Sequence, residues 1–84
     1  MNNFPRNPAI LLKLSEIGND LTWIQSTSMF ARTITDSVKT GQISTAIKMI
    51  YDQSKLNRPL TAHIVGEKTL EKIESLFATM HLYA

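Results

Sequence analysis

The apolar residues of this chain recur at intervals of three and four positions, which is the spacing of one face of an α-helix. No segment alternates apolar and polar residues as a half-buried strand does. The chain is therefore predicted to be all-α. Pro8 suits the first position of a helix. Ile10, Leu11, Leu14 and Ile17 form an apolar face, so the first helix is predicted over residues 8–17.

A second apolar stripe follows Gly18-Asn19-Asp20. If one ideal helix continued through both stripes, they would face directions about 120° apart. Gly18 and Asn19 tolerate the left-handed conformation that ends helices, and Asp20 is a good helix cap. We therefore predict a break there and a second helix over residues 20–40. Its predicted inward residues are Trp23, Ile24, Phe30, Ala31, Ile34 and Val38.

The alternative is one long helix through residues 8–40. The residues that favour it, spaced by four and three in turn, are Ile10, Leu14, Ile17, Leu21 and Ile24. This spacing is typical of a coiled-coil helix, but it fades after Ile24. The choice matters because a break lets the chain fold into a compact domain, whereas a long helix would leave an apolar seam for a partner.

The second half of the chain has clearer boundaries. Gly41 ends the second helix, and a third is predicted over residues 42–56. Arg58 precedes Pro59 and should leave the helical region, after which Thr61 can cap a short helical turn at 61–65. Gly66 is predicted to separate that turn from a last helix over residues 67–82. The predicted fold is a compact bundle of four principal helices, at about 8–17, 20–40, 42–56 and 67–82, with the short turn before the last.

The size of the chain predicts one domain over residues 1–84, with residues 1–6 as a flexible N-terminus. A domain this short buries only about 60% of its unfolded surface and gains by association. There is no cysteine to form a disulfide, and no apolar run reaches the roughly 18 residues of a membrane span. We expect a cytoplasmic protein that does not enter a membrane.

The sequence carries no pattern of catalytic or metal-binding residues. His63 and Glu67 are four apart, but Gly66 between them is predicted to break the helix that would give this spacing meaning. There is no glycine-rich phosphate loop and no nucleophile motif. We therefore expect a protein that is not an enzyme, with no metal, no cofactor and no small-molecule ligand.

Several large apolar residues fall outside the predicted inward faces. These are Leu12, Leu21, Met29, Met49 and Leu56. Met49 and Leu56 are seven apart and so share a stripe on the back of the third helix. They either close a second layer of the core or bind a partner. The predicted function is a non-catalytic protein–protein interaction module, an adaptor, inhibitor or assembly factor, that binds another protein and itself as a homodimer. The candidate interface residues are Met49, Leu56, Leu12, Met29 and Tyr83.

The alternative function is a small DNA-binding regulator. Residues 60–76, "LTAHIVGEKTLEKIESL", have the helix, glycine turn and helix of a helix-turn-helix unit. The stretch "GEKTLEKI" also resembles the second half of a helix-hairpin-helix motif, although Ile64 stands where that motif usually has another glycine. The candidate contacts are Lys68, Lys72, Arg58 and Lys55. Against this, Glu67, Glu71 and Glu74 would face phosphates, and the net charge is only +2.

Overall fold

The computed structural model describes residues 8–25 and 27–82, and these residues form five helices. They are α1 (Pro8–Leu21), α2 (Met29–Lys39), α3 (Ile43–Leu56), α4 (Arg58–Val65) and α5 (Glu67–Leu82). The described residues contain no strand, so the predicted all-α fold is confirmed. The predicted flexible N-terminus at residues 1–6 lies outside them.

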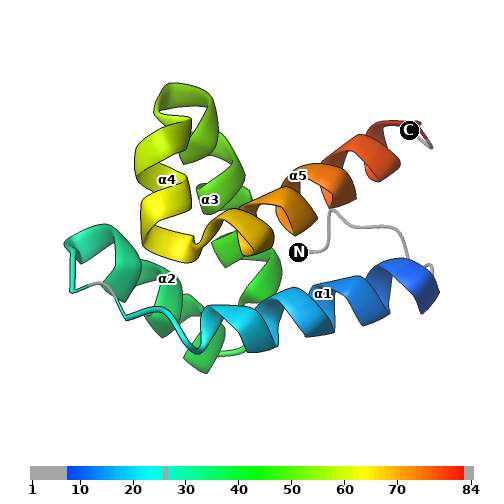
Figure 1. Ribbon diagram of the computed structural model, residues 1–84. Helices are drawn as coiled ribbons and strands as arrows, with labels where there is room; N and C mark the ends of the chain where they lie inside the picture. Colours follow the sequence, from blue (N-terminus) through cyan, green and yellow to red (C-terminus); the bar gives the residue numbers. More distant parts are fainter. Residues whose placement is uncertain (1–7, 26, 83–84) are drawn as a thin grey trace.

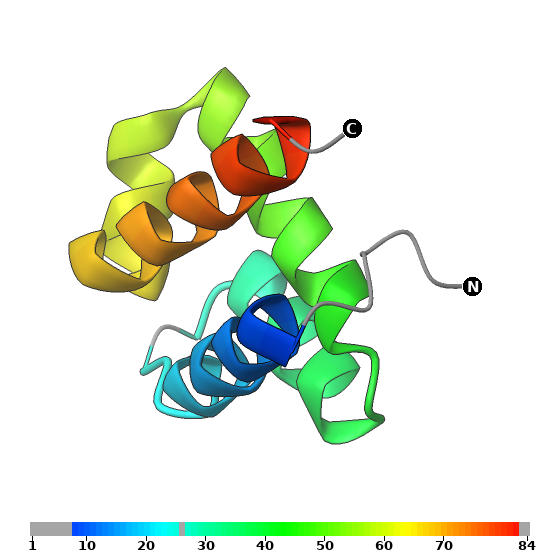
Figure 2. The same ribbon diagram turned by 90° about the vertical axis from the view of Figure 1, so that its right-hand side faces the viewer.

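The helices pack as a compact bundle around α3. α1 and α5 lie side by side and run in roughly opposite directions, so that the start of α1 and the end of α5 are on the same side (Figure 1). α3 contacts each of the other four helices. Turned by 90°, the bundle shows α4 and α5 near the end of α3 and α1 and α2 near its start (Figure 2).

Isoleucine and leucine fill the core where the helices meet. The largest fully buried apolar residues are Ile17, Leu21, Ile34, Ile47, Ile50, Leu70 and Ile73. Every helix except α4 supplies at least one of them, and α4 adds Val65, which is nearly fully buried. Ile47 and Ile50 of α3 and Leu70 and Ile73 of α5 are fully buried at this core. Removing this much apolar surface from water is the main force that holds the helices together.

The predicted helix end near Gly18 is wrong, because α1 continues through Gly18 to Leu21. Gly18 is buried, and a Cβ atom built on it would lie 2.9 Å from the Cδ1 atom of Ile43. The glycine therefore lets α1 approach α3 closely and does not end the helix. The single long helix is also wrong, because the chain leaves helical structure between Leu21 and Met29.

The second helix begins at Met29, nine residues later than predicted. Its cap is Ser28, whose side-chain oxygen accepts a hydrogen bond from the Ala31 N–H at 3.1 Å. Leu21, which had no place in the predicted inward faces, is fully buried at the end of α1. It lies four residues after Ile17, so it continues the inward face of α1. Trp23, predicted to point inward, is 75% exposed.

The predicted turn at 61–65 is an eight-residue helix, α4, that begins at Arg58. Asn57 caps it by accepting a hydrogen bond from the Leu60 N–H at 3.2 Å. Pro59 lies in the first turn, where its missing N–H costs nothing. Thr61, predicted as the cap, is instead fully buried and donates to the Asn57 carbonyl at 2.8 Å. Gly66 follows with φ of +95°, and α5 begins at Glu67 as predicted.

Candidate functional site

A cleft of about 500 Å³ lies between the α1–α2 loop, whose residues 23–25 line it, and the corner where α4 meets α5. We call it the Trp23 cleft. The residues that define its chemistry are Asp20, Trp23, Ile24, His63, Lys68 and Lys72. They come from three helices and one loop, so the cleft exists only in the folded chain.

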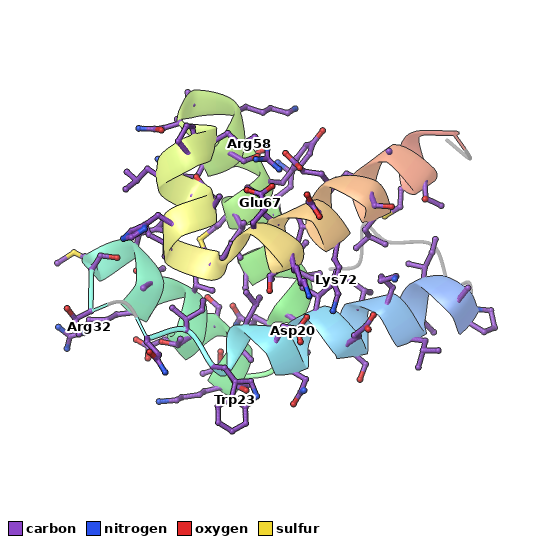
Figure 3. All side chains as sticks on the ribbon, in the orientation of Figure 1. Asp20, Trp23, Arg32, Arg58, Glu67 and Lys72 are labelled. Atoms are coloured by element: carbon purple, nitrogen blue, oxygen red, sulfur yellow. The ribbon has the colours of Figure 1, made fainter. Side chains whose placement is uncertain are left out.

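The backbone turns that end α1 place Trp23 at the rim of the cleft. The Trp23 N–H donates to the Asp20 carbonyl at 3.1 Å, and the Ile24 N–H donates to the Leu21 carbonyl at 3.4 Å. Residues two apart on such a turn point about 200° apart by helical geometry, so Leu21 enters the core while Trp23 faces water. Figure 3 shows Trp23 pointing away from the helices. Ile24 is half-buried and packs against the core.

The acidic group of the cleft already has a partner. The Lys72 Nζ atom lies 2.8 Å from the Asp20 Oδ2 atom and 3.5 Å from the Glu16 Oε2 atom, so it joins α5 to α1 (Figure 3). The hydrogen bond to Asp20, with help from both negative charges, raises the pKa of Lys72. These three charged groups stabilise the contact between α1 and α5. Their charges, one positive and two negative, sum to −1.

A lysine and a histidine at the cleft have no partner within the described residues. Lys68 and His63 lie on either side of Gly66, and both are exposed. The structure records no hydrogen bond or ion pair for either of them. The cleft therefore combines an exposed aromatic ring with an unpaired ammonium group and an unpaired imidazole. Such a surface offers apolar contact and hydrogen-bond donors to a ligand.

On another face of α5, Arg58 joins two carboxylates. Its Nη2 atom lies 2.8 Å from Glu67 Oε2 and 2.8 Å from Glu74 Oε1, and its Nε atom donates to Glu74 at 2.9 Å (Figure 3). These bonds, first to Glu74 and then to Glu67, raise the pKa of Arg58. The same guanidinium lowers the pKa of Glu67. The cluster fixes the start of α4 against α5.

The four candidate nucleic-acid contacts therefore differ in availability. Arg58 and Lys72 are held by carboxylates, and Lys55 lies 4.5 Å from the centre of the Tyr51 ring. Only Lys68 is unpaired. Arg58 is bound to the α5 face that holds Glu67 and Glu74, which lies about 100° or more around the helix from Lys68. The structure does not gather these cations on one face.

The candidate protein-interface residues also differ in their exposure to solvent. Leu12, Met29 and Leu56 are exposed at 74%, 82% and 81%. Met49 is half-buried against the core, so it does not share an exposed stripe with Leu56 as predicted. Tyr83 lies outside the described residues. Sequence reasoning missed Trp23 as a surface residue, although the inward spacing of Ile17 and Leu21 was the signal that places it outward.

A second hollow of about 620 Å³ is lined by Tyr51, Ser54, Lys55, Glu74, Phe77 and Ala78. Its rings stack on each other, with the centroids of Tyr51 and Phe77 4.1 Å apart. Its polar groups have partners too, since Ser54 donates to the Tyr51 carbonyl at 2.6 Å and Glu74 binds Arg58. The Trp23 cleft is therefore the better candidate for a binding site.

Comparison of the chain with models of protein families, with curated proteins and with solved structures finds no match. Within residues 8–25 and 27–82, no three histidine or acidic side chains are grouped to hold a metal ion. None of the described helices has both the length and the apolar character to cross a bilayer. The features that bear on function are therefore the geometry of the Trp23 cleft and the exposed apolar side chains.

Proposed function

We propose that this protein is a small non-catalytic interaction module that binds a partner protein through the Trp23 cleft. The observation that carries the proposal is the exposure of Trp23, at 75%, beside a cleft of about 500 Å³. Tryptophan is the side chain that contributes most often to the energetic centres of protein interfaces, because it offers a large apolar area at a small entropic cost. A packing role would bury this ring, and the fold leaves it in water.

The other end of the same loop supports the proposal. Met29 follows the loop as the first residue of α2 and is 82% exposed. Methionine is common on partner-binding surfaces because its unbranched side chain adapts to different shapes. The loop 22–28 is thus flanked by two large apolar side chains that contribute little to the core.

A separate patch supports association of the chain with itself. Leu56 and Leu60 lie on either side of Asn57, where α3 meets α4, and they are 81% and 47% exposed. A C2 dimer that covers this corner would bury both residues of both copies. Sedimentation velocity over a range of protein concentrations tests it. We expect a concentration-dependent dimer that Leu56→Lys abolishes. A monomer at every concentration would contradict self-association.

Partner binding is tested by capture from cells of the native host. The bait proteins are the wild type, Trp23→Ser and Leu56→Ser, each checked for folding by circular dichroism. We expect one or more proteins that the wild type and Leu56→Ser retain and that Trp23→Ser loses. Leu56→Ser is the matched control, because it also removes an exposed apolar side chain but lies away from the cleft. If all three baits retain the same proteins, the cleft is not the binding site.

The DNA-binding alternative has weaker support. The unit α4–Gly66–α5 keeps the helix, turn and helix order of a DNA-binding motif. Binding to phosphates needs several available cations, and carboxylates hold Arg58 and Lys72. Titration with unrelated duplex DNA at two salt concentrations separates the functions. A micromolar affinity that falls steeply with salt would favour the regulator over the interaction module.

A further inference from the structure

We propose that the occupant of the Trp23 cleft is an acidic segment of a partner protein that carries at least one large apolar side chain. The inference rests on the proposed function and adds the chemistry of the partner. It is drawn from the charges that line the cleft, from those that are already paired, and from the size of the apolar surface beside them.

The charges of the cleft favour an acidic ligand. Lys68 and Lys72 are its two lysines, and Asp20 is its acidic residue. Asp20 is bound to Lys72 at 2.8 Å, which leaves Lys68 without a carboxylate. The imidazole of His63, which also lines the cleft, adds a second hydrogen-bond donor beside the Lys68 ammonium group. An acidic side chain placed between Lys68 and His63 would therefore supply the acceptor that the fold does not.

The carboxylates of α5 do not cancel this charge. Glu67 and Glu74 are bound to Arg58 at 2.8 Å each, on another face of the helix. Glu71 is exposed and is not among the residues that line the cleft. Lys68 thus remains the uncompensated charge at this wall, and it attracts an acidic segment at low ionic strength.

The apolar residues of the cleft indicate that the ligand also carries an apolar side chain. Trp23 lines the cleft with its side chain exposed, and Ile24, the next residue, is half-buried. The volume of about 500 Å³ falls within the range of roughly 300–1,000 Å³ that small ligands and side-chain anchors occupy. It holds a few side chains of a short segment. A leucine or phenylalanine of the segment would pack against the exposed Trp23 while the acidic residue contacts Lys68.

A nucleic acid would also offer negative charge and stacking bases, but the cleft suits it less well. Affinity for a phosphate backbone rises with the number of cations that contact it, and the cleft offers one unpaired lysine. A protein segment needs only one or two acidic contacts.

The test uses Trp23 as its own reporter, since it is the one tryptophan of the chain. The full-length protein is titrated with four probes of ten units each. They are a peptide of glutamate, leucine and phenylalanine, the same peptide with lysine for each glutamate, oligoglutamate, and oligothymidylate. We expect the first to shift the Trp23 emission to shorter wavelength and to bind at least tenfold more tightly than each of the others, with an affinity that falls as salt is added.

Two charge reversals localise the contact. Lys68→Glu should weaken binding of the acidic apolar peptide at least tenfold. Lys55→Glu, which changes an exposed lysine outside the cleft by the same charge, should leave binding within twofold. Far-ultraviolet circular dichroism and thermal melting of both variants show that each is folded. Amide shifts in an NMR titration should centre on residues 20–25 and 63–72.

Four results would overturn the inference. The first is no binding of the acidic apolar peptide at about 1 mM peptide, and the second is equal binding of the lysine peptide or of oligothymidylate. The third is binding that Lys68→Glu does not change. The fourth is an emission shift that grows with protein concentration alone, which would make a second copy the occupant. If Trp23→Ser loses the captured host protein but Lys68→Glu keeps it, the inference fails and the proposed function stands. If Trp23→Ser keeps that protein, the proposed function fails.

Discussion

The two walls of the Trp23 cleft are built in opposite ways. One wall is the corner between α4 and α5, where a single residue, Gly66, changes the direction of the chain with φ of +95°. The other is the α1–α2 loop, which takes residues 22–28 to make its connection. The tight corner is further fixed by Arg58 between Glu67 and Glu74, whereas the loop carries the exposed Trp23.

Two glycines near these walls have different structural roles. Gly66 has the positive φ that other residues avoid, and it ends α4. Gly18 lies within α1, three residues before its end, and serves to clear the side chain of Ile43. One glycine provides a backbone conformation and the other provides space. The residue type is the same, and the surroundings decide which property is used.

The largest predicted difference in the free energy of unfolding is between substitutions of Leu21 and Trp23, two positions apart at the end of α1. Leu21→Ala should lower the free energy of unfolding by about 2–5 kcal/mol, because it leaves a cavity in the core. Trp23→Ala should change it by less than about 0.5 kcal/mol, because the ring is exposed. Urea unfolding followed by circular dichroism measures both. A large loss for Trp23→Ala would make the ring a structural residue and weaken its role in binding.

Gly18→Leu tests the close contact between α1 and α3. The added side chain would meet Ile43, whose Cδ1 atom is 2.9 Å from an ideal Cβ position. We expect a loss of about 3 kcal/mol, near the upper end of overpacking effects. The companion Ile43→Ala should recover part of that loss in the double variant. If Gly18→Leu is as stable as the wild type, the helices are not held as closely as described.

Gly66→Ala should have a smaller effect of a different origin. No atom lies closer than 4.0 Å to the added Cβ, so the cost comes from the backbone conformation alone. We expect a loss of about 1–2 kcal/mol in thermal or urea unfolding. No second substitution at a neighbouring side chain should rescue it, in contrast to Gly18. Full rescue by Thr69→Ala would show a steric cause and contradict this account.

The smallest effect concerns the charges of the tight corner. Because Arg58 lowers the pKa of Glu67, this pair stabilises the folded state above the ordinary glutamate pKa of 4.5, and the contribution is lost as pH falls below it. Arg58→Gln should therefore lower the melting temperature at pH 7 and have a smaller effect near pH 3. The control is Lys48→Gln, which removes an exposed pair with Asp52. NMR titration of Glu67 should show its pKa rise in Arg58→Gln.

Much of the fold follows from the sequence by itself. The helical spacing of apolar residues and the breakers Gly41, Pro59 and Gly66 were enough to predict α3 and α5 to within one residue. Breakers act through local backbone preference, and stripes act through burial of one face, so both are visible in a single chain. The same rules predicted an all-α bundle.

Only the tertiary structure decided the rest. Gly18 lies inside a helix, where its missing side chain leaves room for Ile43, far along the chain. Lys72 and Arg58 are unavailable to a nucleic acid because their carboxylates come from residues nine to fifty-six positions away. Trp23 is a surface residue because α1 keeps its inward face as far as Leu21. A sequence pattern reports neighbours along one helix, whereas contact, pairing and exposure depend on how separate helices pack together.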